Sequence, residues 1–195
     1  MTYYATFGEI LLIIGLLDFS SSVLKLESKY PQIKYLVFLS ILFIAITASF
    51  GAFRFAGFEQ VIGIHDTSSW VSKHFAMLFY ASGSAILFLD ANKQNKLVMT
   101  VIILVGASLG ASLSGNTLII DIVLFVCLIM LSFNTEQKQK VWGALAVLLL
   151  VPLTSLLPVS EDLKMGVFHV LLGCHFMLMA HCFKLRVINQ NKLTL

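Results

Sequence analysis

Residues 4–34 read YATFGEILLIIGLLDFSSSVLKLESKYPQIK, and this stretch predicts both the fold class and the orientation of the chain. Its first part, residues 4–24, is apolar and long enough to cross a bilayer core, which takes about 20 helical residues. Lys25, Lys29 and Lys34 follow directly. A long apolar run with basic residues at one end is typical of a transmembrane helix whose basic end lies in the cytoplasm.

Six more apolar runs follow the first one. They lie at residues 35–57, 71–90, 97–114, 117–133, 141–157 and 163–183. Only helices and closed barrels satisfy all backbone hydrogen bonds within a bilayer, and barrel strands are short and alternating, so each of these continuous runs must be a helix. We therefore predict an all-α, polytopic membrane protein in which residues 1–195 form a single domain of seven transmembrane helices.

The composition supports a membrane protein and excludes other classes. The chain is 58% hydrophobic and only 12% charged, with a mean hydropathy of +0.93, whereas soluble domains carry roughly 25% charged residues. Seven spans would use almost the whole chain, so no room is left for a separate soluble domain. We expect no nucleic acid among the partners, because no basic stripe is interleaved with aromatic residues.

The basic residues are divided unequally between the two sides of the predicted bundle. Ten of the 13 lysines and arginines lie in or beside the loops of one side, namely Lys25, Lys29, Lys34, Lys93, Lys96, Lys138, Lys140, Lys184, Arg186 and Lys192. Only Arg54, Lys73 and Lys164 lie on the other. The positive-inside rule then places the N-terminus outside and the C-terminus in the cytoplasm. We expect a multi-pass protein surrounded by lipid bilayer, in a membrane such as the bacterial inner membrane.

The run at residues 97–114 carries small residues at every fourth position. These are Gly106, Gly110 and Ser114. Small residues at this spacing let helix backbones approach closely. They predict that this helix is a central packing helix or the contact surface of a homo-oligomer.

The run at residues 141–157 contains a predicted break near its outer end. Pro152 and Pro158 flank Thr154 and Ser155. Proline removes a helical hydrogen bond, and nearby hydroxyl groups can satisfy the carbonyl groups that it frees. The sequence therefore predicts a kink or a broken end here.

The three runs before residues 97–114 and the three after them form a weak repeat. Glu9 and Asp121 each lie about one turn below the outer surface, in the first and fifth runs. His74 and His169 lie near the outer starts of the third and seventh runs. Parallel three-helix repeats occur in transporters, so a 3+1+3 parallel repeat is predicted. Chance alignment of leucine-rich helices is the alternative.

Ionisable residues gather at the outer ends of the predicted helices. Glu9, Arg54, His74, Asp121 and His169 lie within about two turns of those ends. The outer loops just above them carry Glu59, His65, Asp66, Glu161 and Asp162. A charged group inside a span costs at least ~2.5 kcal/mol near the helix centre and normally faces the bundle interior. The outer layer is therefore where we expect a functional site.

Two kinds of site would use these residues. Neutral imidazoles and carboxylates at converging helix ends can bind zinc and leave a position open for an activated water. The predicted zinc ligands are His65, His74 and His169. Asp66 or Asp121 would act as general base or support a ligand, and Arg54 would hold an anionic group. Alternatively, the same residues face a cavity and bind a cationic solute or relay protons. Some of them are simply interfacial side chains in a third interpretation.

The placement of these residues resembles the seven-helix alkaline ceramidase and adiponectin-receptor group of membrane hydrolases. In that group zinc lies where the end of helix 2 and the starts of helices 3 and 7 meet. The corresponding places here hold Arg54 with His65, then His74, then His169 with His175. The resemblance implies a zinc-dependent hydrolase with a lipid-like substrate. The pair of histidines four residues apart on helix 7 of that group is not matched, because Gly173 stands where the partner of His169 would be.

Three functions remain open. The first is a metal-dependent membrane hydrolase with an outward-facing site and zinc as its cofactor. The second is a small transporter or channel with no cofactor, since the three–one–three layout also resembles the seven-helix sugar transporters. The proline–glutamine signature of those transporters is missing from the repeat helices, because Pro31-Gln32 lies in a loop. The third is a non-catalytic membrane subunit. A lipid or small-molecule ligand is the expected partner in the first two cases.

Overall fold

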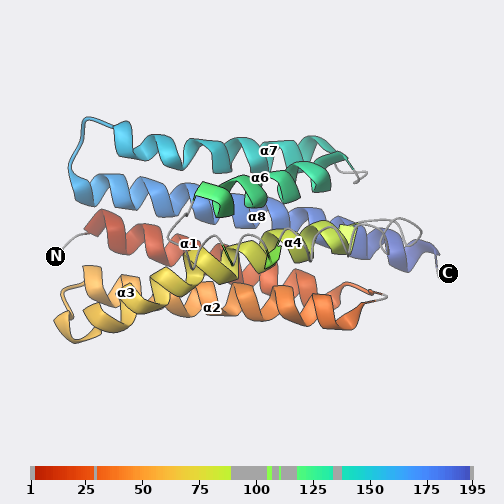
Figure 1. Ribbon diagram of the computed structural model, residues 1–195, viewed down its shortest axis with the longest axis horizontal. Helices are drawn as coiled ribbons and strands as arrows, with labels where there is room; N and C mark the ends of the chain where they lie inside the picture. Colours follow the sequence, from red (N-terminus) through yellow and green to blue (C-terminus); the bar gives the residue numbers. More distant parts are fainter. Residues whose placement is uncertain are drawn as a thin grey trace.

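The chain forms a bundle of helices that run side by side along one axis. The computed structural model describes residues 3–28, 30–88, 105–106, 110, 118–133 and 138–193, and these residues contain no strand. The two termini lie at opposite ends of the bundle (Figure 1).

The α-helices are α1 Tyr3–Lys25, α2 Pro31–Phe55, α3 Ile62–Val71, α4 Met77–Phe88, α6 Leu118–Phe133, α7 Lys138–Leu150 and α8 Glu161–Leu193. Short 3-10 helices η1 (Glu59–Val61) and η3 (Pro152–Leu156) and a π-helical turn η2 (Ser72–Ala76) complete it. The predicted all-α class is confirmed for the described residues.

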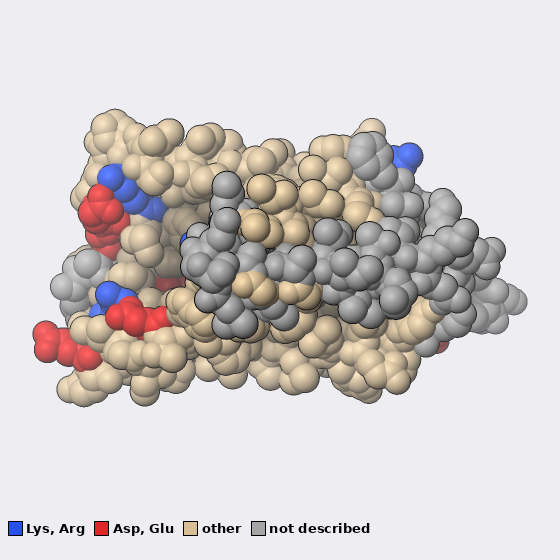
Figure 2. Space-filling model, viewed as in Figure 1, with Lys and Arg blue, Asp and Glu red and all other residues tan. Residues whose placement is uncertain are grey.

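Among the described residues, four helical segments are long and apolar enough to cross a membrane. They are Tyr3–Lys25, Pro31–Phe55, Lys138–Leu156 and Glu161–Gln190, and a shorter apolar helix spans Ile122–Leu131. Large apolar side chains such as Ile10, Leu39 and Leu149 are exposed along these helices, as expected for surfaces that face lipid. Figure 2 shows charged side chains at the ends of the molecule and a tan surface between them on the described part of this face. The run predicted at 97–114 lies largely outside the described residues.

Helices α1 and α8 approach each other through glycines. A Cβ atom at Gly8 would lie 2.6 Å from the carbonyl oxygen of Gly166, and one at Gly15 would lie 2.6 Å from that of Gly173. Each helix therefore presents two glycines one heptad apart to the other, which allows close backbone contact. The small-residue packing that was predicted for Gly106–Ser114 lies largely outside the described residues, whereas the α1–α8 contact was not anticipated. The close α1–α8 contact also gives Gly173 a role in helix packing.

The helix that leads into the third predicted run begins earlier than predicted. The sequence suggested a start at residue 71, with His65 and Asp66 in a loop, but α3 begins at Ile62 and continues through η2 into α4. The π-helical turn Ser72–Ala76 inserts one wider turn between α3 and α4. Such turns are frequently found at functional sites because they redirect side chains.

The predicted break near the outer end of the sixth run is confirmed. Helix α7 ends at Leu150, and Pro152 opens the 3-10 helix η3. The hydroxyl of Thr154 donates to the carbonyl of Val151 at 2.8 Å, and that of Ser155 donates to the carbonyl of Pro152 at 2.8 Å. Side-chain hydroxyls thus satisfy carbonyl groups where the helix changes its geometry.

The middle of the described bundle is closed by an aromatic core. Phe19, Tyr80, Phe176 and Phe183 are fully buried, with ring centroids 4.8–6.1 Å apart. The Tyr80 hydroxyl donates to His175 Nε2 at 2.8 Å, and His175 Nδ1 donates to the carbonyl of Ala144 at 2.8 Å. Both ring nitrogens of the buried histidine are therefore satisfied, so His175 is a structural link between α4, α7 and α8.

Candidate functional site

A cavity of about 680 Å³ lies between the helices, toward the end of the bundle at which α1 begins. It is formed by α1, α2, α3, η2, α4, α6, α7, η3 and α8, and a hollow on this side of the molecule is visible in Figure 2, near the end that carries several charged side chains. Its volume is within the range of pockets that hold small organic ligands.

The polar side chains gather on one wall of the cavity. This wall, made by α2, α3 and η2, carries Thr47, His65, Asp66, Ser69, Ser72 and Lys73, together with the apolar Ile44 and Ala48. The opposite wall, made by α6, α7, η3 and α8, carries Leu124, Phe125, Leu148, Val151, Pro152, Met165, Phe168 and Leu172. Glu9 of α1 and His169 of α8 lie where the two walls meet. Such a cavity suits a molecule with one polar and one apolar part.

Glu9 is the most unusual group in this cavity. Its carboxylate is 2% exposed, and its Oε1 lies 3.3 Å from His169 Nε2. Its Oε2 and the Nδ1 of His169 are buried and have no hydrogen-bond partner among the described residues. A buried polar atom without a partner costs free energy, so its retention indicates a partner that the polypeptide does not supply.

Gly51 of α2 creates the space for this carboxylate. A side chain at position 51 would collide with the Glu9 carboxyl group, and its Cβ would lie 3.1 Å from His65 Nε2. Glu9 and His65 therefore converge on the same point, and His169 reaches it from α8. Phe55 packs against both His65 and His169, with ring centroids at 6.1 and 6.3 Å. The three polar residues form one cluster with an aromatic neighbour.

Arg54 and Asp66 determine which nitrogen of His65 carries the proton. Arg54 Nη1 donates to His65 Nδ1 at 2.9 Å and to Asp66 Oδ1 at 2.5 Å. A guanidinium group only donates, so Nδ1 accepts and we assign the proton of neutral His65 to Nε2, where it faces Ser69 Oγ at 3.2 Å. Burial, followed by the positive charge of Arg54, lowers the pKa of His65 from its ordinary value of 6.5. The neutral form is thus the one that the fold favours.

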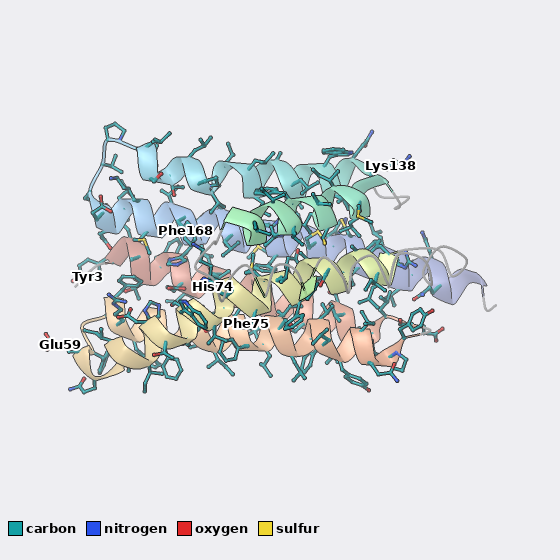
Figure 3. The ribbon with its side chains drawn as sticks, viewed as in Figure 1. Tyr3, Glu59, His74, Phe75, Lys138 and Phe168 are labelled. Carbon is teal, nitrogen blue, oxygen red and sulfur yellow. The ribbon has the colours of Figure 1, made fainter. Side chains whose placement is uncertain are left out.

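The third predicted zinc ligand, His74, lies outside the cavity. Its Nδ1 donates to the carbonyl of Trp70 at 2.7 Å, and its ring stacks on Trp70 with a centroid distance of 4.5 Å. Trp70 is 49% exposed, and His74 is not one of the residues that line the cavity. Figure 3 shows His74 on the π-helical turn, at about the same level along the bundle as Phe168 of α8.

The predicted site residues are therefore only partly brought together. His65, His169 and Asp66 line the cavity, Arg54 supports His65 and Asp66, and the side chain of Asp121 lies outside the described residues, although α6 carries its backbone. Glu9 was predicted to lie in the outer layer but was not predicted to be a site residue. Its signal in the sequence was an acid inside an otherwise apolar run.

The donors of the cluster fit a divalent metal ion in type and, for two of them, in distance. Two histidines and one glutamate form the ligand set of several zinc hydrolases. Ligands about 2.0–2.1 Å from a tetrahedral zinc lie about 3.3 Å apart, as Glu9 Oε1 and His169 Nε2 do. Among the described residues, no three His, Cys, Asp or Glu side chains already stand in metal-binding geometry. His65 departs from a metal-ligand arrangement, because its Nε2 carries a proton and its Nδ1 accepts a hydrogen bond from Arg54.

Comparison with protein-family models, curated proteins and solved structures finds no match for this chain. The resemblance to the alkaline ceramidase and adiponectin-receptor group stays a prediction.

The lowered pKa of His65 predicts a pH dependence of stability for the metal-free protein. Because its pKa is lower in the folded than in the unfolded state, the unfolded state binds more protons as the pH falls below about 6.5. The contribution of His65 to the unfolding free energy is therefore complete above that pH and is lost as the pH falls below it.

We expect His65→Gln to reduce the loss of thermal stability between pH 8 and pH 5. Arg54→Met should reduce it partly, since burial remains. An unchanged pH dependence in His65→Gln would contradict this.

Proposed function

We propose that the chain crosses the membrane seven times, with its N-terminus outside. Three observations support the proposal: four helices have spanning length and composition, the termini lie at opposite ends of the bundle (Figure 1), and the basic residues are concentrated on the C-terminal side. The cavity would then open toward the outside. The 3+1+3 repeat and an oligomer contact at residues 97–114 stay predictions.

We propose that the protein is a metal-dependent membrane hydrolase that acts on an amphiphilic, lipid-like molecule bound in the cavity. The observation that carries this proposal is the buried carboxylate of Glu9, which faces the cavity beside His169 with one oxygen unpartnered. Ionisable groups within a membrane protein are costly and are commonly functional. Neither oxygen of this carboxylate has a lysine or arginine beside it among the described ion pairs.

Each residue of the cluster would have a distinct role. Glu9 and His169 would hold the ion, and His65 would join them once its Nε2 is free of the proton. Such an ion supplies Lewis acidity that activates water for attack on a carbonyl carbon. Asp66, which lines the cavity beside His65, would accept the proton of that water. The apolar wall would bind the hydrocarbon part of the substrate and exclude bulk water from the reacting groups.

A transport function is less well supported by the described residues. His175 would have been a deep member of a polar pathway, but both of its nitrogens are engaged by Tyr80 and Ala144. The residues that line the cavity reach Leu12, Met77 and Leu172 and do not include His175. Below them lies the aromatic core around Phe19 and Phe176.

Hydrolysis can be tested directly on the purified protein in nanodiscs. We expect zinc-loaded protein to release the acyl group of fluorogenic long-chain esters or amides, and chelator-treated protein to lose this activity until zinc is restored. Short-chain acetyl analogues should react poorly, because they leave the apolar wall unused. Activity that survives complete removal of the metal would contradict the proposal.

The position of Arg54 predicts that this residue opposes metal binding. In Arg54→Met, His65 Nδ1 can carry the proton and donate it to Asp66 Oδ1, which already lies 3.6 Å away. Histidines that bind metals commonly donate their other N–H to a carboxylate in this way. We expect Arg54→Met to bind Co²⁺ or Zn²⁺ about tenfold more tightly than the unaltered protein. Lys73→Gln, which removes a cation from the same cavity without touching His65, should have a much smaller effect. Equal or weaker binding by Arg54→Met would refute this role.

A further inference from the structure

We propose that the cavity selects an anionic amphiphile, with its hydrocarbon chain against α6, α7 and α8 and its anionic head group at Lys73. This inference rests on the proposed function and names the class of substrate for that site.

Lys73 is the cation at the cavity that lacks an acidic partner in the part of the chain that the structure describes. Arg54 is paired with Asp66, and Lys164, on the same side of the bundle, is paired with Glu161 at 2.6 Å. Lys73 lines the cavity, and no acidic partner lies within ion-pair distance of it among the described residues. An anionic head group would meet an ammonium group that need not break an existing ion pair.

The neighbours of Lys73 suit such a head group. Ser69 lies on the same wall, and its Oγ accepts from His65 Nε2, so its own hydroxyl proton can be donated to an oxygen of a phosphate or carboxylate. The hydroxyl groups of Ser72 and Thr47 are engaged with each other and with the protein, because Thr47 Oγ1 donates to the carbonyl of Phe43 at 3.0 Å and lies 2.9 Å from Ser72 Oγ. Glu9 lies beside His169, where the two walls meet, and it forms no ion pair with Lys73.

The opposite wall is apolar. It is made by α6, α7, η3 and α8, and its eight lining side chains carry no charge and no hydroxyl group. A hydrocarbon chain that packs against these side chains gains many close van der Waals contacts. An amphiphile whose two ends match the two walls would therefore bind more tightly than either end alone.

Equilibrium binding of radiolabelled dodecyl phosphate tests the inference. The protein is reconstituted in nanodiscs of phosphatidylcholine, and binding to empty nanodiscs is subtracted. We expect saturable binding that unlabelled dodecyl phosphate displaces but that dodecyltrimethylammonium and inorganic phosphate do not. Lys73→Gln should weaken it about tenfold or more, because a hydrogen bond to a charged group is lost, and Lys73→Arg should retain it. Lys164→Gln is the matched control and should change affinity less than about twofold, as its charge is already paired with Glu161.

The outcomes separate this inference from the proposed function. Undiminished binding in Lys73→Gln, equal displacement by dodecyltrimethylammonium, or no saturable binding overturns the inference, even if the protein binds metal and hydrolyses neutral substrates. If inorganic phosphate, which has no hydrocarbon chain, displaces dodecyl phosphate, the site binds anions in general and the inference is also overturned. Binding that depends on Lys73 in a protein without metal or hydrolytic activity would support the inference and reject the hydrolase.

Discussion

Replacing Glu9 with Gln is expected to abolish high-affinity metal binding while the fold stays intact. The substitution removes a charged ligand but preserves shape, so the affinity for Zn²⁺ should fall by more than the 10–100-fold that outer-shell partners typically cost. Hydrolysis should fall with it. The thermal stability of the metal-free protein should be unchanged or higher, because a buried carboxylate with an unpartnered oxygen is replaced by a neutral amide.

The combination of these two readouts makes the test specific. A carboxylate that served only to stabilise the bundle would lower stability when neutralised and would leave metal content unaffected. Glu161→Gln provides the matched control, since Glu161 is exposed and pairs with Lys164 at the surface. It should keep both metal binding and stability. Loss of stability without loss of metal in Glu9→Gln would reject the role assigned to Glu9.

Gly15→Ala is expected to destabilise the helix bundle. The new methyl group would lie 2.6 Å from the carbonyl oxygen of Gly173, and backbone cannot move aside as a flexible side chain does. Forced separation of packed elements costs about 1–3 kcal/mol. The midpoint of thermal unfolding in detergent should fall accordingly, and the cavity should be disturbed, because α1 carries Glu9 and α8 carries His169.

Gly63→Ala is the matched control for this substitution. A Cβ atom at Gly63, in α3, would have nothing within 4 Å, and alanine has the higher helix propensity by up to about 1 kcal/mol. The control should therefore be neutral or stabilising. Equal stability of the two variants would contradict the close α1–α8 contact.

Much of the helical architecture could be predicted from the sequence, because a bilayer leaves few choices to a continuous apolar run. The runs at 4–24 and 163–183 correspond to α1 and α8, and the break at Pro152 was anticipated from proline chemistry. The contact between α1 and α8 was not, since glycines one heptad apart in two distant helices have no visible relation until the fold joins them.

The site was only partly predictable for a similar reason. Depth in the membrane could be inferred from hydropathy, and it placed Glu9, His65 and His169 in one layer. Which side chains share a cavity depends on helix rotation, and the π-helical turn at Ser72–Ala76 changes that rotation. His74, predicted as a ligand, is directed to Trp70, whereas Glu9, which was not predicted as a ligand, lies beside His169.

The Co²⁺ spectrum of the purified protein tests the central claim most directly. A ligand set of Glu9, His65 and His169 with one open position predicts one ion bound per chain and the intense visible absorption of tetrahedral cobalt, both lost in Glu9→Gln and His169→Ala. Absence of stoichiometric binding at saturating metal, or a spectrum that both substitutions leave unchanged, would contradict the account.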